Sequence, residues 1–400
     1  MAEISDVYFV DGVRTPFGRA GEKGMYWNTR ADDMVVKAMI GLMERNPDVP
    51  GARVDDVAIA ATTQEGDQGL TLGRTAAILA GLPQSVPGFA IDRMCAGAMT
   101  SVTTMAGSIG IGMYDIALAG GVEHMGRHPL GGDADPNPRF LTEKLVSADA
   151  LNMGITAERI HDRFPHLTKE RADRFGMLSQ HKVQAAYDAG KIQSDLVPVA
   201  IKNADGAWGL ATEDEGRRPQ TTMEDLASLK TPFRPHGRVT AGTSSPLTDG
   251  ATISLLAGGA AVKELGLQPK MKLVSFAFAG VQPEIMGIGP VPSTEKALKK
   301  AGLTIDDIGL FELNEAFAIQ VLSLLDHFGI ADDDPRVNQW GGAIAFGHPL
   351  AASGVRLMIQ LAAQFKERPD VRYGLTAMCV GLGQGGSVIW ENPFYNGKRK

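Results

Sequence analysis

One cysteine stands where a reactive thiol is easily positioned. Cys95 follows a predicted strand at residues 88–91 and precedes the run Ala96-Gly97-Ala98, which starts a predicted helix. The free N–H groups and positive dipole end of a helix stabilise a thiolate, so we expect a lowered thiol pKa and a nucleophile at Cys95, with small neighbours that let a substrate approach. A small buried core residue is the alternative interpretation.

A histidine and a second cysteine could handle protons. His348, in Gly347-His348-Pro349, also precedes a predicted Gly/Ala-rich helix, and a neutral imidazole there could take the proton of a thiol. Cys379 ends a predicted strand and could shuttle a proton. A structural histidine and a buried strand cysteine are the alternatives.

Asn314 lies where an apolar predicted strand, residues 308–313, turns into a helix. Its amide could orient a water molecule or donate to an oxyanion. The alternative is an ordinary helix N-cap, a position that asparagine favours.

Two further patterns predict no site. The glycine-rich stretch 381–386 matches a dinucleotide fingerprint and follows a strand, but it leads into Ser-Val-Ile-Trp and not into a helix. His124 and His128 have the spacing of metal ligands on one helical face, yet Gly126 and Pro129 oppose a helix there. We therefore expect neither a dinucleotide site nor a metal site.

The elements that position these residues alternate along the chain. Strands are predicted at residues 7–10, 57–61 and 88–91, with helices at about 32–44 and 72–82 between them. Such a βαβα rhythm indicates a sheet covered by helices on both faces. The predicted fold class is α/β.

Two distant segments share one pattern. Residues 89–121 and 343–383 each contain a loop with a reactive-type residue, a helix rich in small residues, and a strand that ends in a glycine-rich turn. This similarity indicates an internal duplication. Between the two segments, residues 125–250 are rich in Pro, Gly, Ser and Asp and predict an inserted, loop-rich region.

Within this region, residues 217–238 form a basic island. It contains five basic side chains and two acids, in a chain whose formal charge is −7: Arg217, Arg218, Lys230, Arg234 and Arg238 against Glu224 and Asp225. The island suits a phosphate-bearing ligand, and a solvated loop with scattered charge is the alternative.

Composition bounds the remaining possibilities. The 400 residues exceed the usual size of one core, and 44% hydrophobic with 21% charged residues is typical of globular proteins. Two cysteines exclude a disulfide framework and fit a reducing compartment. The acidic balance opposes a nucleic-acid or anionic-membrane partner. Without a signal-like start or a long apolar run, we expect a cytoplasmic protein with no transmembrane segment.

Ordered motifs along the whole chain resemble those of the thiolase family. They include the loops around Cys95, Asn314, His348 and Cys379, and further matches lie at residues 11–18, 68–74, 120–123, 153–158, 240–251, 286–290 and 341–343. Any one of these motifs is weak, but their combination and order are specific.

The resemblance implies a fold and a reaction. The fold would be a five-layered αβαβα sandwich of two duplicated halves with an inserted loop domain. Residues 1–124 with 251–272 would form the first half, 125–250 the insert and 273–400 the second half. The reaction would be thiolytic cleavage of a 3-ketoacyl-CoA by CoA, giving acetyl-CoA and an acyl-CoA shorter by two carbons. CoA would be a co-substrate, with no cofactor bound permanently.

The resemblance also assigns roles to residues. Cys95 would attack the keto carbon after giving its proton to His348, and Cys379 would be the second acid and base. One oxyanion hole would be His348 with a water held by Asn314, and the other the N–H groups of Cys95 and Gly381. Four further positions match CoA contacts, Arg218 at the nucleotide and the rest at the pantetheine: Ser245, Phe233 and Met286.

Some positions depart from the common family pattern. Asp92 replaces a frequent Asn, Gly97 a frequent Ser, and Asn152 a frequent His, which bears on acyl-chain selectivity. The stretch Asn338-Gln339-Trp340-Gly341-Gly342, with Trp where Asn is commoner, resembles the same stretch in the thiolase subunits of trifunctional β-oxidation complexes. The family resemblance implies a homodimer or higher oligomer, and the match around Trp340 implies that it joins a hydratase/3-hydroxyacyl-CoA dehydrogenase α-subunit. The segment 128–145 would either set chain length or dock a partner.

Alternative functions stay open at this point. A biosynthetic acetoacetyl-CoA thiolase would share these motifs but reject long acyl chains. A catalytically silent thiolase-like subunit is opposed by the intact candidates at Cys95, His348, Cys379 and Asn314. A condensing enzyme that uses acyl-carrier protein shares the fold but lacks the Cys379-Val380-Gly381 element.

Overall fold

Strands that are buried along their whole length form the centre of the molecule. The computed structural model describes residues 4–132, 134–203 and 205–397. Its main sheet has ten strands, in the order β10-β11-β12-β9-β1-β8-β5-β3-β4 with β2 paired to β8. Every residue of β5 (Ile116–His124) and β8 (Thr248–Gly258) is buried. Helices must therefore cover both faces, as the α/β prediction requires.

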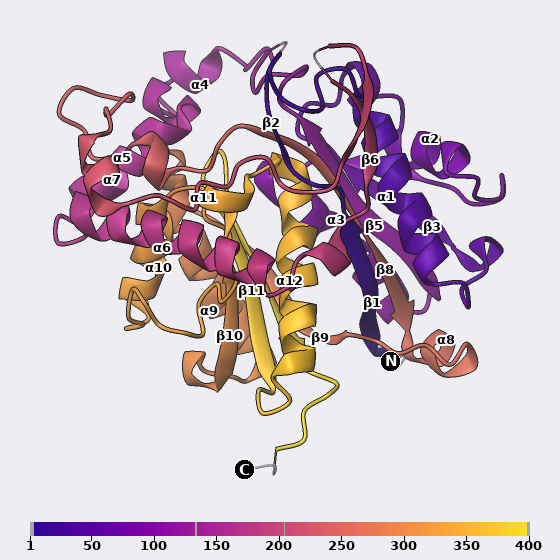
Figure 1. Cartoon of the computed structure of the whole chain (residues 1–400). Coiled ribbons are helices and arrows are strands. Elements are labelled where there is room, and N and C mark those ends of the chain that lie inside the picture. The colour runs from indigo at the N-terminus through magenta and orange to yellow at the C-terminus, as the bar shows by residue number, and fades with distance from the viewer. Residues whose placement is uncertain (1–3, 133, 204, 398–400) are drawn as a thin grey trace.

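The N-terminal half contains the strands at one end of the sheet (Figure 1, indigo and purple, with β8 and α8 in salmon). Besides β5 and β8, its strands are β1 (Val7–Arg14), β2 (Gly18–Arg19), β3 (Asp56–Ala60) and β4 (Phe89–Ile91). Its helices are α1 (Ala31–Arg45), α2 (Leu72–Leu79), α3 (Gly97–Gly110) and α8 (Gly259–Glu264).

One predicted boundary in this half is wrong. The helix expected over residues 72–82 ends at Leu79. Gly81 has the left-handed φ of +82° and Pro83 follows it, so the backbone leaves the helix early.

The C-terminal half repeats most of the element order of the first, without counterparts of β2 and β4 among its described residues. Its strands are β9 (Met271–Gly280), β10 (Ile308–Leu313), β11 (Tyr373–Val380) and β12 (Gln384–Glu391). Its helices are α9 (Pro290–Ala301), α10 (Ala318–His327), α11 (Ala343–Phe346) and α12 (Ser353–Glu367). The parallel pair β3 and β5 with antiparallel β8 corresponds to the parallel pair β10 and β11 with antiparallel β12. The predicted similarity of the two halves is therefore present in their topology.

Two helices lie between the halves. α3 packs on β3 and β5, α12 packs on β10 and β11, and the two helices contact each other. On the outer faces, α1 and α2 cover the first half and α9 covers the second. Together with the two parts of the sheet, these contacts give the five layers. The parts join where β1 pairs with β9 over Tyr8 and Phe9.

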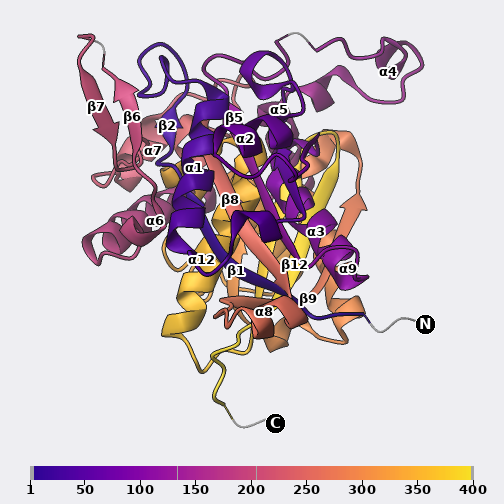
Figure 2. The ribbon, with the colours of Figure 1, turned by 90° about the vertical axis from the view of Figure 1, so that its right-hand side faces the viewer.

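The segment between β5 and β8 carries its own elements. They are α4 (Arg139–Thr142), α5 (Met153–Arg163), α6 (Lys169–Asp188), β6 (Val199–Lys202), β7 (Trp208–Ala211) and α7 (Met223–Ser228). Figure 2 shows the β6–β7 hairpin and α4 projecting at opposite edges of the molecule. The division of the chain at residues 124, 250 and 272 stays a prediction.

Candidate active site

Cys95 lies in a tight turn that leads into α3. This 3-10 turn, η3 (Met94–Ala96), packs against η9 (Leu350–Ala352) and against the end of β11. A Cβ at Gly97 would lie 2.9 Å from the Cβ of Ala351 in η9. The small residues after Cys95 therefore let its helix approach η9, which begins two residues after His348.

The expectation of a lowered thiol pKa is wrong. Cys95 is only 7% exposed, and burial raises its thiol pKa to about 12. The N–H groups of Gly381 and of Cys95 itself favour the thiolate, and the carboxylate of Glu123 opposes it. Desolvation by burial outweighs the helix start, so the thiol is neutral and needs a base.

His348 is fixed as a neutral imidazole. Its ring Nδ1 lies 2.5 Å from Ser353 Oγ, and its ring Nε2 lies 3.3 Å from Asn314 Nδ2. The backbone N–H of His348 donates to Thr248 Oγ1 at 3.0 Å. Burial, followed by the nearby charge of Arg356, lowers the His348 pKa to about 3. An uncharged ring, which keeps a lone pair on one nitrogen, is the form that accepts a proton.

Asn314 lies at the end of β10 and is fully buried. Its N–H donates to the carbonyl of Ala377 at 2.9 Å, which ties it to β11. Helix α10 begins at Ala318 with Phe317 at the N-cap position, so the N-cap interpretation of Asn314 is wrong. Its amide instead faces His348.

Cys379 lies near the end of β11 and is also buried. Burial raises its pKa, and Cys95 raises it further, which places the two thiols within electrostatic reach. Gly381 follows directly, and a Cβ there would lie 2.7 Å from Cε of Met94. The structure thus brings Cys95, Cys379 and Gly381 together, and it brings His348 and Asn314 together.

The basic island is mostly neutralised by acids. Arg217 pairs with Glu213, and Arg234 and Arg238 pair with Asp162. Among the described residues, the Arg218 and Lys230 side chains have no carboxylate partner. Arg218 is exposed, and its backbone N–H donates to Oε1 of Gln180 on α6 at 2.8 Å. An anchored backbone with a free guanidinium is suited to a phosphate.

The other expected CoA contacts gather beside the turn after β10. The Ser245 N–H donates to the carbonyl of Ala316 at 3.0 Å. Phe233 meets Phe317 edge-on, with ring centroids 6.4 Å apart, and the buried Met286 of η7 (Pro283–Ile288) belongs to the same apolar cluster. Arg218 lies on a different segment, anchored on α6.

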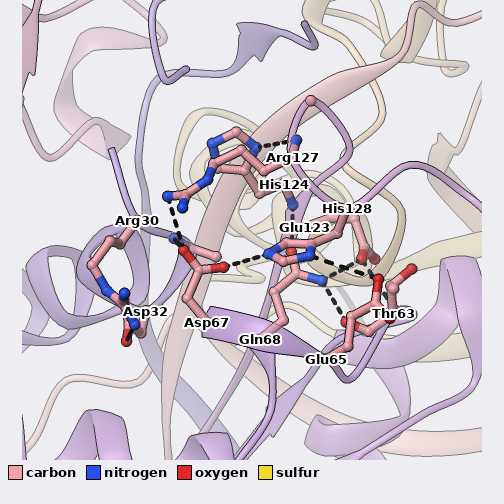
Figure 3. A network of polar contacts seen from close by, with 12 residues as sticks. Arg30, Asp32, Thr63, Glu65, Asp67, Gln68, Glu123, His124, Arg127 and His128 are labelled. Atoms are coloured by element: carbon pink, nitrogen blue, oxygen red, sulfur yellow. Dashed lines mark hydrogen bonds and ion pairs between the residues drawn. The ribbon is translucent and has the colours of Figure 1, made fainter. Parts of the chain in front are cut away.

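Sequence reasoning missed a buried carboxylate beside the site. Glu123, at the end of β5, accepts the N–H of Ala351 at 3.1 Å and so holds η9. It also accepts hydrogen bonds from the loop after β3, including one from Gln68 Nε2 at 3.0 Å (Figure 3). Burial raises its pKa. The sequence signal that could have identified Glu123 is an acid at the end of an otherwise apolar strand.

The structure also shows what the two histidines and the glycine-rich stretch do instead. His124 Nε2 lies 2.9 Å from the Tyr26 carbonyl oxygen, and His128 pairs with Asp67 (Figure 3). The glycine-rich stretch after Cys379 continues as strand β12 (Gln384–Glu391), so no helix follows the glycines, as the sequence predicted.

A sandwich of two similar halves with a buried thiol beside their central helices defines the thiolase fold class. Residues 7–259 match the family model "Thiolase, N-terminal domain", and residues 267–392 match "Thiolase, C-terminal domain". The chain belongs to the thiolase family.

Full-length relatives agree with this assignment. The chain is 43% identical over 390 residues to a 3-ketoacyl-CoA thiolase of Idiomarina loihiensis, covering 97% of this chain and 100% of that protein. It is 42% identical to a 3-ketoacyl-CoA thiolase of Pseudoalteromonas translucida, covering 97% and 99%.

Solved structures are similar over the same length. Human mitochondrial 3-ketoacyl-CoA thiolase superposes with a TM-score of 0.88 at 32% identity, covering 98% of this chain and 100% of that one. The Bacillus anthracis acetyl-CoA acetyltransferase gives 0.87 at 31% identity, with the same coverage.

Proposed function

We propose that this thiolase is an acyltransferase of fatty acid β-oxidation that cleaves 3-ketoacyl-CoA with CoA. The products are acetyl-CoA and an acyl-CoA shorter by two carbons. One observation carries the proposal: a neutral, buried His348 faces the Asn314 amide, next to the turn that holds Cys95. Relatives named 3-ketoacyl-CoA thiolase support the same substrate class.

The first half-reaction forms an acyl-enzyme. His348 Nε2 takes the proton of Cys95 while the sulfur attacks the keto carbon. Because burial disfavours a free thiolate, proton transfer accompanies the attack. The N–H groups of Cys95 and Gly381 donate to the oxyanion that develops on the former keto oxygen, and the protonated His348 with a water held by Asn314 donates to the thioester oxygen as the enolate forms. The bond between C2 and C3 breaks, the acyl group stays on Cys95, and Cys379 protonates the departing acetyl-CoA enolate.

The second half-reaction transfers the acyl group to CoA. The Cys379 thiolate takes the proton of the CoA thiol, and the CoA sulfur attacks the acyl-Cys95 thioester. The N–H groups of Cys95 and Gly381 again donate to the oxyanion, because it forms on the same acyl oxygen as in the first half-reaction. Cys95 leaves as a thiolate and regains its proton from His348, so both residues return to their starting forms.

CoA binding uses separate parts of the insert and the second half. Arg218 binds a phosphate of the nucleotide, while Ser245, Phe233 and Met286 line the path of the pantetheine. CoA is a co-substrate, and the mechanism uses no permanently bound cofactor. The free guanidinium of Arg218 supports the first assignment, and the grouping beside Phe317 supports the second.

The cellular setting is also part of the proposal. We place the chain in the cytoplasm, as a homodimer or higher oligomer that joins a hydratase/3-hydroxyacyl-CoA dehydrogenase α-subunit. Support for that partner comes from the stretch around Trp340, which resembles the same stretch in the thiolase subunits of such complexes. Among the residues that the structure describes, no helix combines the length and apolar character needed to cross a membrane.

A biosynthetic acetoacetyl-CoA thiolase is the second candidate, favoured by the similarity to an acetyl-CoA acetyltransferase. The test compares CoA-dependent loss of acetoacetyl-CoA and of 3-ketohexadecanoyl-CoA, with and without a candidate α-subunit. Efficient cleavage of the long substrate supports β-oxidation. Reaction of acetoacetyl-CoA alone favours the biosynthetic enzyme, and inactivity in every mixture would overturn both.

A further inference from the structure

A buried arginine contacts the site from α12. Arg356 lies one turn after Ser353, and its side chain is 1% exposed. Its Nη2 donates to Asn314 Oδ1 at 3.4 Å, its Nη1 donates to Gln360 Oε1, and the nearest acid is Glu312, with Oε2 at 3.6 Å. The sequence motifs assigned no role to Arg356.

The surroundings of Arg356 are poorly arranged for stability. Among the described residues, Arg356 Nε and Glu312 Oε2 have no hydrogen-bond partner. A buried charge pair stabilises a fold only when its geometry is good and its remaining polar atoms are satisfied. Because this arrangement lowers the stability of the fold, it points to a role of Arg356 in the neighbouring site.

A guanidinium has five N–H donors and no acceptor. It therefore decides which end of the Asn314 amide faces it, because only Oδ1 can accept. The Nδ2 end is then turned toward His348, with 3.3 Å between Nδ2 and Nε2. Since Nδ2 can only donate, Nε2 must carry the lone pair.

The other side of the imidazole agrees with this direction. Ser353 Oγ donates to the Pro349 carbonyl at 3.3 Å, so it accepts from the Nδ1–H of His348 at 2.5 Å. In the row of hydrogen bonds that runs from Arg356 through Asn314, His348 and Ser353 to Pro349, each residue therefore donates to the next one.

We propose that Arg356 is a positioning residue that orients the Asn314 amide and thereby holds His348 in the tautomer whose Nε2 is a base. This inference rests on the proposed function, in which Nε2 takes the proton of Cys95. Without the guanidinium, the amide is free to turn over. Its Oδ1 would then favour a proton on Nε2, and that tautomer accepts nothing from Cys95.

The test separates positioning from folding. Arg356→Met alone leaves Glu312 without its cation, so the main variant combines Arg356→Met with Glu312→Gln and keeps the core neutral. We expect kcat to fall about 10- to 100-fold, as for a displaced catalytic group, while KM changes less than about 2-fold. Thermal unfolding checks the fold, and Lys366→Met, an exposed basic residue on the same helix, is the matched control.

A conservative variant and a double-mutant cycle identify the route of the effect. Arg356→Lys keeps a donor-only cation and should retain more kcat than Arg356→Met. If Arg356 acts through Asn314, the Arg356→Met and Glu312→Gln pair should reduce kcat little further in an Asn314→Ala enzyme. Multiplicative losses would mean an independent effect and would overturn the inference.

Failure of this inference differs from failure of the proposed function. An unchanged kcat in the folded Arg356→Met and Glu312→Gln enzyme, with a large loss in Asn314→Ala, removes Arg356 alone. Full activity in both Asn314→Ala and Cys95→Ala removes the proposed function as well.

Discussion

Replacing Glu123 by Gln tests whether this buried carboxylate holds the His348 turn. Glu123 Oε2 accepts the N–H groups of Thr62 and Ala351, both at 3.1 Å. Its Oε1 accepts Gln68 Nε2 at 3.0 Å and the N–H of Thr63 at 3.4 Å. A glutamine has the same shape but only one accepting oxygen. In either orientation of its amide, one buried and one partly buried donor lose their acceptor.

The size of the effect follows from these contacts. A buried donor left unsatisfied costs about 1–3 kcal/mol, so two would cost about 2–6 kcal/mol if both were fully buried, and partial burial of one donor lowers this sum. The neutral side chain recovers part of this, because burial already disfavours the charged form of Glu123 and raises its pKa. We therefore expect a destabilisation of about 2–3 kcal/mol, a large share of the about 5–15 kcal/mol typical of folded proteins.

Urea unfolding of Glu123→Gln and wild type at neutral pH measures the difference in unfolding free energy. Glu367→Gln removes an acid from an exposed pair with Lys191 and should change it by less than about 1 kcal/mol. The kcat of Glu123→Gln should also fall, because Ala351 belongs to the turn that follows His348. A stability within about 0.5 kcal/mol of wild type would refute the argument that four hydrogen bonds converge on this carboxylate.

Two further predictions concern charge. Arg218→Ala should raise KM for CoA about 10-fold with a smaller change in kcat, because a charge-assisted phosphate contact is lost. Arg174→Ala, which removes an exposed arginine paired with Asp333, should leave KM unchanged, and equal effects of the two variants would detach Arg218 from CoA. Burial raises the Glu312 pKa from 4.5 to about 7, so the folded protein keeps this proton where the unfolded chain has lost it. The resulting stability is fully present below about pH 4.5 and is lost as pH rises through about 7. Glu312→Gln should flatten this decline in unfolding free energy, and an unchanged slope would contradict the assignment.

Local signals singled out several candidate residues of the site. Cys95 and His348 became candidates because each precedes a predicted helix rich in small residues, and Cys379 because a predicted strand ends there, and the family resemblance then assigned their roles. These signals lie within a few residues of the chain. The repeat of the element order was visible for the same reason, since each half forms its own strands and helices.

Properties set by distant packing were not predictable in this way. The pKa of Cys95 rises because η9 and the end of β11 bury its sulfur, and both come from the other half of the chain. Arg356 and Glu123 look like ordinary charges until the fold places them against Asn314 and Ala351. The end of α2 depended on one glycine in a left-handed conformation.

The acyl-enzyme itself is the most direct test of the proposed reaction. The enzyme is mixed with 3-ketohexadecanoyl-CoA in the absence of CoA, quenched in acid and digested, and its peptides are analysed by mass spectrometry. The mechanism predicts a tetradecanoyl thioester on Cys95, one equivalent of acetyl-CoA released per site, and neither product from Cys95→Ala. Release of acetyl-CoA with Cys95 unmodified, or an acyl group on Cys379 instead, would contradict it.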